Sequence, residues 1–212
     1  MTEREYQVES FWLWLCSLKK LYRPVRELLL TYFGTPEAVF FAPDYEIVGF
    51  PGLKDEEKEE LLHTRREWEP EKNWRQLKEQ GIRFVSSQAA EYPEKLKNIY
   101  DYPHGLFVKG KLPDLHIPTV AVVGARNSSA YGRHFAKEIA QELAASGVQV
   151  VSGMARGIDG TAQKAVLAEG GSSFAVLGSG VDICYPAQHR NLYQMLIEKG
   201  GVLSEFPAGT QP

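Results

Sequence analysis

The second half of the chain alternates between short apolar runs and segments with helical periodicity, and this alternation constrains the fold more than any other feature. Residues 120–123 (Val-Ala-Val-Val) form a continuous apolar run, which is typical of a strand buried on both faces of a parallel sheet. Within residues 130–146, Phe135, Ile139 and Leu143 recur on one face of a predicted helix. Further strands are predicted at residues 148–151, 174–177 and 202–203, and further helices at residues 159–169 and 189–199. Strands and helices that alternate through short loops predict an α/β fold with a parallel sheet.

Glycine-rich turns follow three of the predicted strands. The candidate residues in these turns are Gly124, Arg126, Ser128 and Ser129, then Gly153, Arg156 and Gly157, and finally Gly178 and Gly180. The carboxyl ends of parallel strands meet at one edge of a sheet, so we expect the three turns to lie together there. Free N–H groups at helix starts attract anions, and arginine guanidinium groups match the geometry of phosphate. The competing interpretation, that each glycine only makes a tight turn, explains a single turn better than three neighbouring ones.

Two of these turns also contain predicted helix starts. Ser128 or Ser129 is the predicted N-cap of the first helix, and Asp159 is the predicted N-cap of the second. Arg126 stands where the dinucleotide fingerprint Gly-x-Gly-x-x-Gly requires its second glycine, which disfavours a nicotinamide or flavin cofactor. The sequence therefore predicts a phosphate-binding edge and no cofactor.

The first half of the chain has a different composition, and the change falls near residues 112–118, where two prolines mark a connector. Residues 1–70 are predicted to form a small helical domain, in which Thr35 caps a helix with Pro36 at its first position. Residues 71–118 are predicted to be a connecting region with two short strands. Residues 119–212 are predicted to be the α/β domain.

The charge and the reactive side chains exclude several classes of function. A net charge of −3 and a pI of about 6.0 exclude nucleic-acid binding through bulk charge, so any such binding needs local cations. The five histidines are scattered, so no metal site is predicted, and Cys16 and Cys184 are too few for a disulfide framework. Cys184 could be a nucleophile, but no partner base lies near it in the sequence, so a thiol in the core is the favoured interpretation. The apolar run at residues 11–16 is too short to cross a membrane. These features predict a cytoplasmic protein, and they contain no recognisable catalytic constellation.

Several sequence blocks occur in the order typical of one bacterial protein family. The blocks are Val-Val-Gly-Ala-Arg at 122–126, Tyr-Gly at 131–132, Val-Ser-Gly-Met-Ala-Arg-Gly-Ile-Asp at 151–159, Ala-Val-Leu-Gly-Ser-Gly-Val-Asp at 175–182, Tyr-Pro at 185–186 and Leu-Ser-Glu at 203–205. Together with Glu-Tyr-Pro at 91–93, they resemble the DNA-processing protein A family, also called DprA or Smf. The resemblance covers residues 8–212 and is strong from about residue 91.

This resemblance implies a fold and a function. The fold is a Rossmann-like parallel sheet with helices on both faces, preceded by a helical domain similar to a sterile-alpha-motif or helix-hairpin-helix bundle. The function is to bind single-stranded DNA and deliver it to the RecA recombinase in natural transformation, as a homodimer and without catalysis. The family's phosphate pocket maps onto the candidate residues of the first two turns, and Arg190 is the cation nearest to the basic contact that follows Tyr-Pro in the family.

Two departures from the family pattern and two alternative functions remain. Gln163 stands where the family usually has histidine, and by this resemblance the chain is a fragment that lacks the family's C-terminal part. One alternative is a nucleotide-binding enzyme similar to the phosphoribohydrolases, although their Pro-Gly-Gly-x-Gly-Thr-x-x-Glu block is absent. The other is an interaction module that acts through the helical domain.

Overall fold

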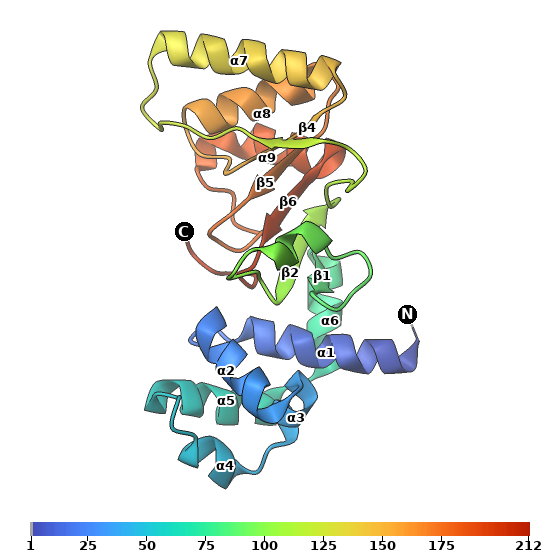
Figure 1. The fold of residues 1–212 in the computed structure, drawn as a ribbon, viewed down its shortest axis with the longest axis vertical. Helices are drawn as coiled ribbons and strands as arrows, with labels where there is room; N and C mark the ends of the chain where they lie inside the picture. Colours follow the sequence, from blue (N-terminus) through green and yellow to red (C-terminus); the bar gives the residue numbers. More distant parts are fainter. Residues whose placement is uncertain (1) are drawn as a thin grey trace. The chain divides into compact units, whose positions relative to one another are not determined.

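A computed structural model describes residues 2–212, and the chain divides into two compact units. The first unit contains the residues up to 79 together with residues 84–106, and the second contains residues 80–83 and 107–212. Figure 1 shows the elements of each unit. None of the helices in the described part of the chain is long and apolar enough to cross a membrane.

The first unit is mainly helical. Its elements are α1 (Glu3–Ser17), α2 (Arg23–Phe33), α3 (Pro36–Phe41), α4 (Asp44–Gly49), α5 (Asp55–Glu67), α6 (Pro70–Glu79), most of β1 (Arg83–Ser86), the 3-10 helix η1 (Glu94–Asn98) and the start of β2 (Gly105–Gly110). Thr35 caps α3 by accepting a hydrogen bond from the Ala38 N–H at 3.1 Å, and Pro36 is its first residue, as predicted. Trp14, Leu29 and Leu61 are fully buried and belong to the core of this unit. The predicted helical bundle is therefore confirmed.

The second unit is built on a sheet whose strands alternate with helices. Its further elements are β3 (Thr119–Ala121), α7 (Ala130–Ala145), β4 (Gln149–Ser152), α8 (Ile158–Ala168), β5 (Ser173–Val176), the 3-10 helix η2 (Ala187–His189), α9 (Arg190–Lys199) and β6 (Gly201–Ser204). The strand order is β2-β6-β5-β4-β3. β3, β4, β5 and β6 run parallel to one another, whereas β2 pairs antiparallel with β6. The predicted α/β fold with a parallel sheet is confirmed.

The core of the second unit lies between the central strands and α8. Val150 of β4 is fully buried and packs with Ala162 and Val166 of α8. Phe174 and Val202 are buried in the two strands that follow. β4, β5 and β6 therefore each bury apolar side chains, as expected for the central strands of a parallel sheet.

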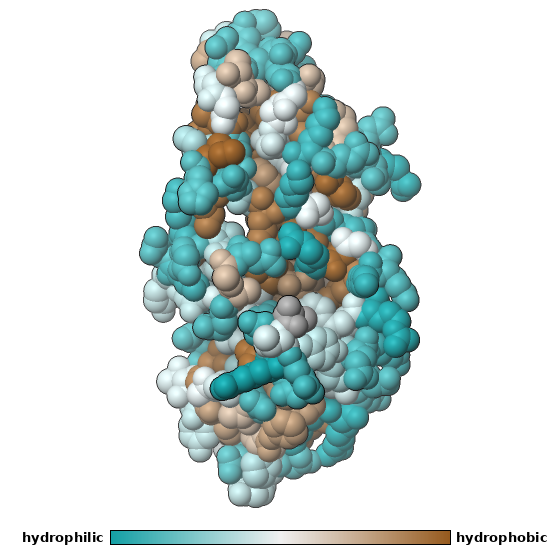
Figure 2. All heavy atoms as spheres, turned by 90° about the vertical axis from the view of Figure 1, so that its right-hand side faces the viewer, coloured by the Kyte–Doolittle hydropathy of each residue, from teal (hydrophilic) through white to brown (hydrophobic). Residues whose placement is uncertain are grey.

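The expectation that residues 120–123 are buried is wrong. Residues 120–123 were expected to be buried on both faces, but Val120 is 40% exposed and Val123 is 72% exposed. The reason is that β3 is the edge strand, with β4 as its one neighbour among the described residues. On α7, Phe135 is 51% exposed, and the residues buried on this helix are Ala136 and Ala140. Figure 2 shows hydrophobic surface, in brown, between hydrophilic side chains of the second unit in the upper half of the view.

Candidate functional site

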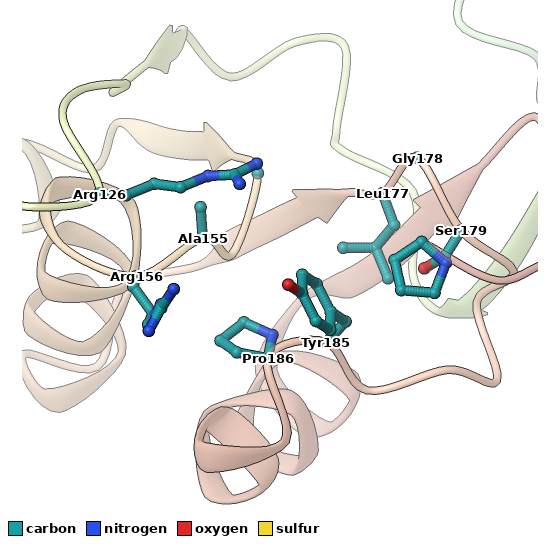
Figure 3. Close-up of a pocket in the computed structure, with 10 residues that line it drawn as sticks. Arg126, Ala155, Arg156, Leu177, Gly178, Ser179, Tyr185 and Pro186 are labelled. Carbon is teal, nitrogen blue, oxygen red and sulfur yellow. The ribbon is translucent and has the colours of Figure 1, made fainter.

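A cavity of about 310 Å³ opens beside the turns that follow β4 and β5. Its lining residues are Arg126, Gly153, Ala155, Arg156, Leu177, Gly178, Ser179, Tyr185, Pro186 and Pro212. Figure 3 shows Arg126 and Arg156 on one side of this cavity, with Leu177, Tyr185 and Pro186 on the other. The cavity thus has a cationic wall and an apolar, aromatic wall.

The structure brings together four of the candidate residues at this cavity. Arg126 comes from the turn after β3, Gly153 and Arg156 come from the turn after β4, and Gly178 comes from the turn after β5. This placement agrees with the expectation that three glycine-rich turns share one edge of the sheet. The binding role of these residues stays a prediction.

The two cavity arginines are accessible to a ligand. Both residues are exposed, and within residues 2–212 neither guanidinium group forms an ion pair or a hydrogen bond. A guanidinium group without a carboxylate partner keeps all five of its N–H donors for water or for an anion. The cationic wall therefore has unused capacity for phosphate.

The backbone amides of the first two turns were expected to be free to bind an anion, but two of them bind a side chain of the protein. The Asp159 carboxylate accepts hydrogen bonds from the Gly124 N–H at 3.2 Å and from the Gly153 N–H at 3.1 Å. Asp159 was expected to be the N-cap of α8, but the N-cap is Gly157, and Asp159 lies in the first turn of the helix. The amides of Gly124 and Gly153 are therefore occupied by a carboxylate of the protein, so they are not free donors for phosphate.

Two of the candidate glycines allow the chain to pack closely. Gly157 has a φ of +83°, and a Cβ atom there would lie 2.1 Å from the Ala125 carbonyl oxygen. A Cβ atom on Gly180 would lie 2.8 Å from the Pro207 carbonyl oxygen, and the Gly180 N–H donates to the Thr210 carbonyl at 2.9 Å. Gly157 and Gly180 therefore shape the turns behind the cavity and do not line it.

The remaining candidate residues also lie outside the cavity lining. Ser129 is the N-cap of α7, because its hydroxyl accepts a hydrogen bond from the Gly132 N–H at 3.0 Å, as predicted. The Ser128 carbonyl accepts a hydrogen bond from the Arg133 guanidinium group. Arg190 is exposed at the start of α9, where it opposes the rise that burial causes in the pKa of the Cys184 thiol.

Gln163, which replaces the family histidine, is fully buried in the interior of the second unit. Its side-chain amide donates to the Phe174 carbonyl at 3.0 Å and approaches the Ser173 hydroxyl at 3.4 Å. These contacts join α8 to β5. Gln163 is therefore a structural residue and does not line the cavity.

The sequence reasoning missed the apolar wall. Tyr185 and Pro186 were identified as a motif but not as site residues, and Ala155, Leu177, Ser179 and Pro212 carried no signal of their own. The Tyr-Pro pair after the third glycine-rich turn is the sequence feature nearest to this wall, but the 51% exposure of Tyr185 is known only from the structure.

The fold and the cavity define a Rossmann-like protein with an arginine-lined site at the ends of its parallel strands. The model of the family described as DNA recombination-mediator protein A matches residues 83–212, which is more than half of the chain. The chain belongs to this family.

Curated relatives extend the likeness and are longer than this chain. Protein Smf of Escherichia coli is 42% identical over 137 residues, which cover 64% of this chain and 37% of that protein. Protein Smf of Synechocystis is 29% identical over 208 residues, which cover 96% of this chain and 52% of that protein. The DNA processing protein DprA of Streptococcus pneumoniae is 43% identical over 121 residues, which cover 57% of this chain and 43% of that protein. The chain thus spans about a third to a half of the length of these relatives.

Two solved structures resemble this fold. The crystal structure of DprA from Streptococcus pneumoniae has a TM-score of 0.73 and 28% identity, and the match covers all of this chain and 71% of that one. The structure of DprA from Helicobacter pylori has a TM-score of 0.55 and 26% identity, over 62% of this chain and 58% of that one. The description of the second structure concerns its mode of binding single-stranded DNA.

Proposed function

We propose that the second unit binds single-stranded DNA at the cavity of about 310 Å³. The observation that carries the proposal is the pairing of two accessible guanidinium groups, Arg126 and Arg156, with an aromatic wall at one cavity. Phosphate groups contact the cationic wall, and a base contacts the apolar wall. Family membership and the solved DprA structures support the choice of DNA as the ligand.

The cationic wall sets the electrostatic part of binding. Because the chain has a net charge of −3, distant charges contribute little attraction, and the local arginines have to supply it. For single strands, log Kobs falls with log salt concentration with a slope of about −0.7 for each phosphate contacted. Two phosphate contacts therefore give a slope of about −1.4.

The apolar wall accounts for a preference for single strands. Tyr185 is half exposed, and Figure 3 shows its ring beside the cavity, where an unpaired base can stack on it. Stacking of a base on an aromatic side chain contributes about 1–3 kcal/mol and tolerates any sequence. A base held inside a duplex cannot make this contact, so duplex DNA binds more weakly.

The biological role follows from the family. We extend the proposal to delivery of the bound strand to the RecA recombinase in natural transformation, with a homodimer as the acting form. The description of the family as recombination mediators supports this extension. Among the described residues that line the cavity, none has a carboxylate or imidazole side chain, and we assign no chemical step to it.

The test is a binding titration of a labelled oligo-dT by fluorescence anisotropy. Removing both cavity arginines, as Arg126→Ala with Arg156→Ala, is expected to weaken binding by about 100-fold or more, because each charge-assisted contact contributes about 1.5–3 kcal/mol. A charge-matched control removes Lys137 and Lys164, which are exposed on α7 and α8 and do not line the cavity. Equal losses in the two double variants would refute the assignment of the site.

A further inference from the structure

Asp159 is a buried carboxylate whose two oxygen atoms join two separate turns. Asp159 is only 6% exposed. Oδ1 accepts the Gly124 N–H at 3.2 Å, and Oδ2 accepts the Gly153 N–H at 3.1 Å. Gly124 follows β3 and Gly153 follows β4, so one side chain holds the ends of two neighbouring strands. These are the turns that carry the two cavity arginines.

We propose that Asp159 is a positioning residue for DNA binding, which presents the two arginines to one cavity and occupies amides that an anion would otherwise take. This inference rests on the proposed function. It assigns the phosphate contacts to the guanidinium groups of Arg126 and Arg156. The amides of Gly124 and Gly153 stay bonded to the carboxylate in both the free and the DNA-bound protein.

The backbone angles and contacts of the second turn show why it needs the hydrogen bond to Asp159. Met154 has a φ of +53°, a value that is uncommon for a residue other than glycine, and its side chain is fully buried. The Met154 carbonyl lies 3.0 Å from Nδ1 of the buried His189. Gly157 follows with a φ of +83°. Arg156 therefore lies between a non-glycine residue in the left-handed region and a glycine with positive φ, and the contacts around Met154 offset the strain of its backbone angle.

The substitution Asp159→Asn separates positioning from simple burial of a polar group. An asparagine side chain has an NH₂ donor in place of one of the two carboxylate oxygens, and each oxygen of Asp159 accepts a different N–H group, so asparagine in the same orientation accepts only one of them. The other N–H then faces a donor, and one turn is released. We expect oligo-dT binding to weaken by about tenfold, as the loss of one well-placed contact predicts. The salt slope is expected to fall from about −1.4 to about −0.7, because one phosphate contact is lost.

The decisive comparison is made in the variant that lacks both cavity arginines. If Asp159 acts through Arg126 and Arg156, then Asp159→Asn has no further effect on the residual DNA binding of that variant. An equal tenfold loss in both backgrounds would overturn the proposal, since it would show a general structural effect. Unchanged or tighter binding by the single variant would also overturn it, because freed amides would then be serving the DNA.

A second measurement uses the unaltered protein, so it does not depend on the folding of a variant. Amide hydrogen exchange of Gly124 and Gly153 is expected to be slow without DNA and equally slow with oligo-dT present. Fast exchange that becomes slow on adding DNA would overturn the inference, because the amides would then be bonding the ligand. If the protein does not bind oligo-dT at all, the proposed function fails. The exchange measured without DNA still tests the link between the two turns.

Discussion

The substitution Gly157→Ala tests the close packing of the first two turns. The backbone of Gly157 has a φ of +83°, and residues with a side chain pay about 1–3 kcal/mol at such angles. The added Cβ atom would lie 2.1 Å from the Ala125 carbonyl oxygen and 2.6 Å from the Arg126 carbonyl oxygen. Both contacts are to backbone, so the first turn has to move, which costs a further amount of about 1–3 kcal/mol. The expected loss in the free energy of unfolding is therefore about 2–6 kcal/mol.

A matched control separates the backbone angle from the clash. Gly147 has a similar φ of +70°, but a Cβ atom there would have no neighbour within 4 Å. Gly147→Ala is expected to cost about 1–2 kcal/mol, through the backbone angle alone. If Gly157→Ala costs no more than Gly147→Ala, the described contact between the two turns is refuted.

The assay has to report on the second unit. The four tryptophans, Trp12, Trp14, Trp68 and Trp74, all lie in the first unit, so tryptophan fluorescence follows that unit. Hydrogen exchange of amides in β4 and β5, measured at increasing urea concentration, reports on the stability of the second unit. The same variant is expected to bind oligo-dT more weakly, because Arg126 and Arg156 lie on the displaced segments.

Three further predictions concern the apolar wall, a buried histidine and the buried face of α7. Tyr185→Ala is expected to weaken binding of oligo-dT by about 1–3 kcal/mol but to leave binding of an abasic oligonucleotide unchanged. Tyr185→Phe is expected to bind both oligonucleotides as the unaltered protein does. Equal losses of Tyr185→Ala on both oligonucleotides would exclude stacking. Burial lowers the pKa of His104 below 6.5, against the opposing hydrogen bond with Glu27. The stability that neutral His104 contributes is therefore complete above about pH 6.5 and is lost as the pH falls from there through the folded-state pKa. Between pH 7 and pH 5, the thermal unfolding temperature of His104→Asn should therefore fall less steeply than that of the unaltered protein. Parallel curves of unfolding temperature against pH would contradict this. Ala140→Leu is expected to destabilise the protein by about 1–3 kcal/mol in urea unfolding, while Phe135→Ser costs less than about 1 kcal/mol, and the reverse order would contradict the described burial of α7.

The parts of the fold that depend on local pattern could be predicted from the sequence. Apolar runs followed by glycine-rich turns located the strands after Thr119, and Ser129 could be expected to cap α7 because hydroxyl side chains near a helix start satisfy free N–H groups. The exposure of Val120 could not be predicted, because it depends on the place of β3 in the strand order. The burial of Ala140 in place of Ile139 depends likewise on the elements that pack against α7.

The chemistry of the site could be predicted only in part. Arg126 and Arg156 were identifiable, because a cation in a turn after a parallel strand points to an anion site. The role of Asp159 was not identifiable, because its partner Gly124 lies 35 residues away in the chain and a carboxylate near a helix start usually caps that helix. Tyr185 follows a longer loop after β5, and no local pattern tells which way its ring points.

The central claim, that a strand of DNA lies in this cavity with a base against the aromatic wall, can be tested by photocrosslinking. An oligo-dT that contains one 5-iododeoxyuridine is irradiated in complex with the full chain, and the adduct is located by mass spectrometry. We predict that the main adduct forms at Tyr185 and disappears when Arg126 and Arg156 are both replaced by alanine. A main adduct in the first unit, or one at Tyr185 that survives the loss of both arginines, would contradict the account.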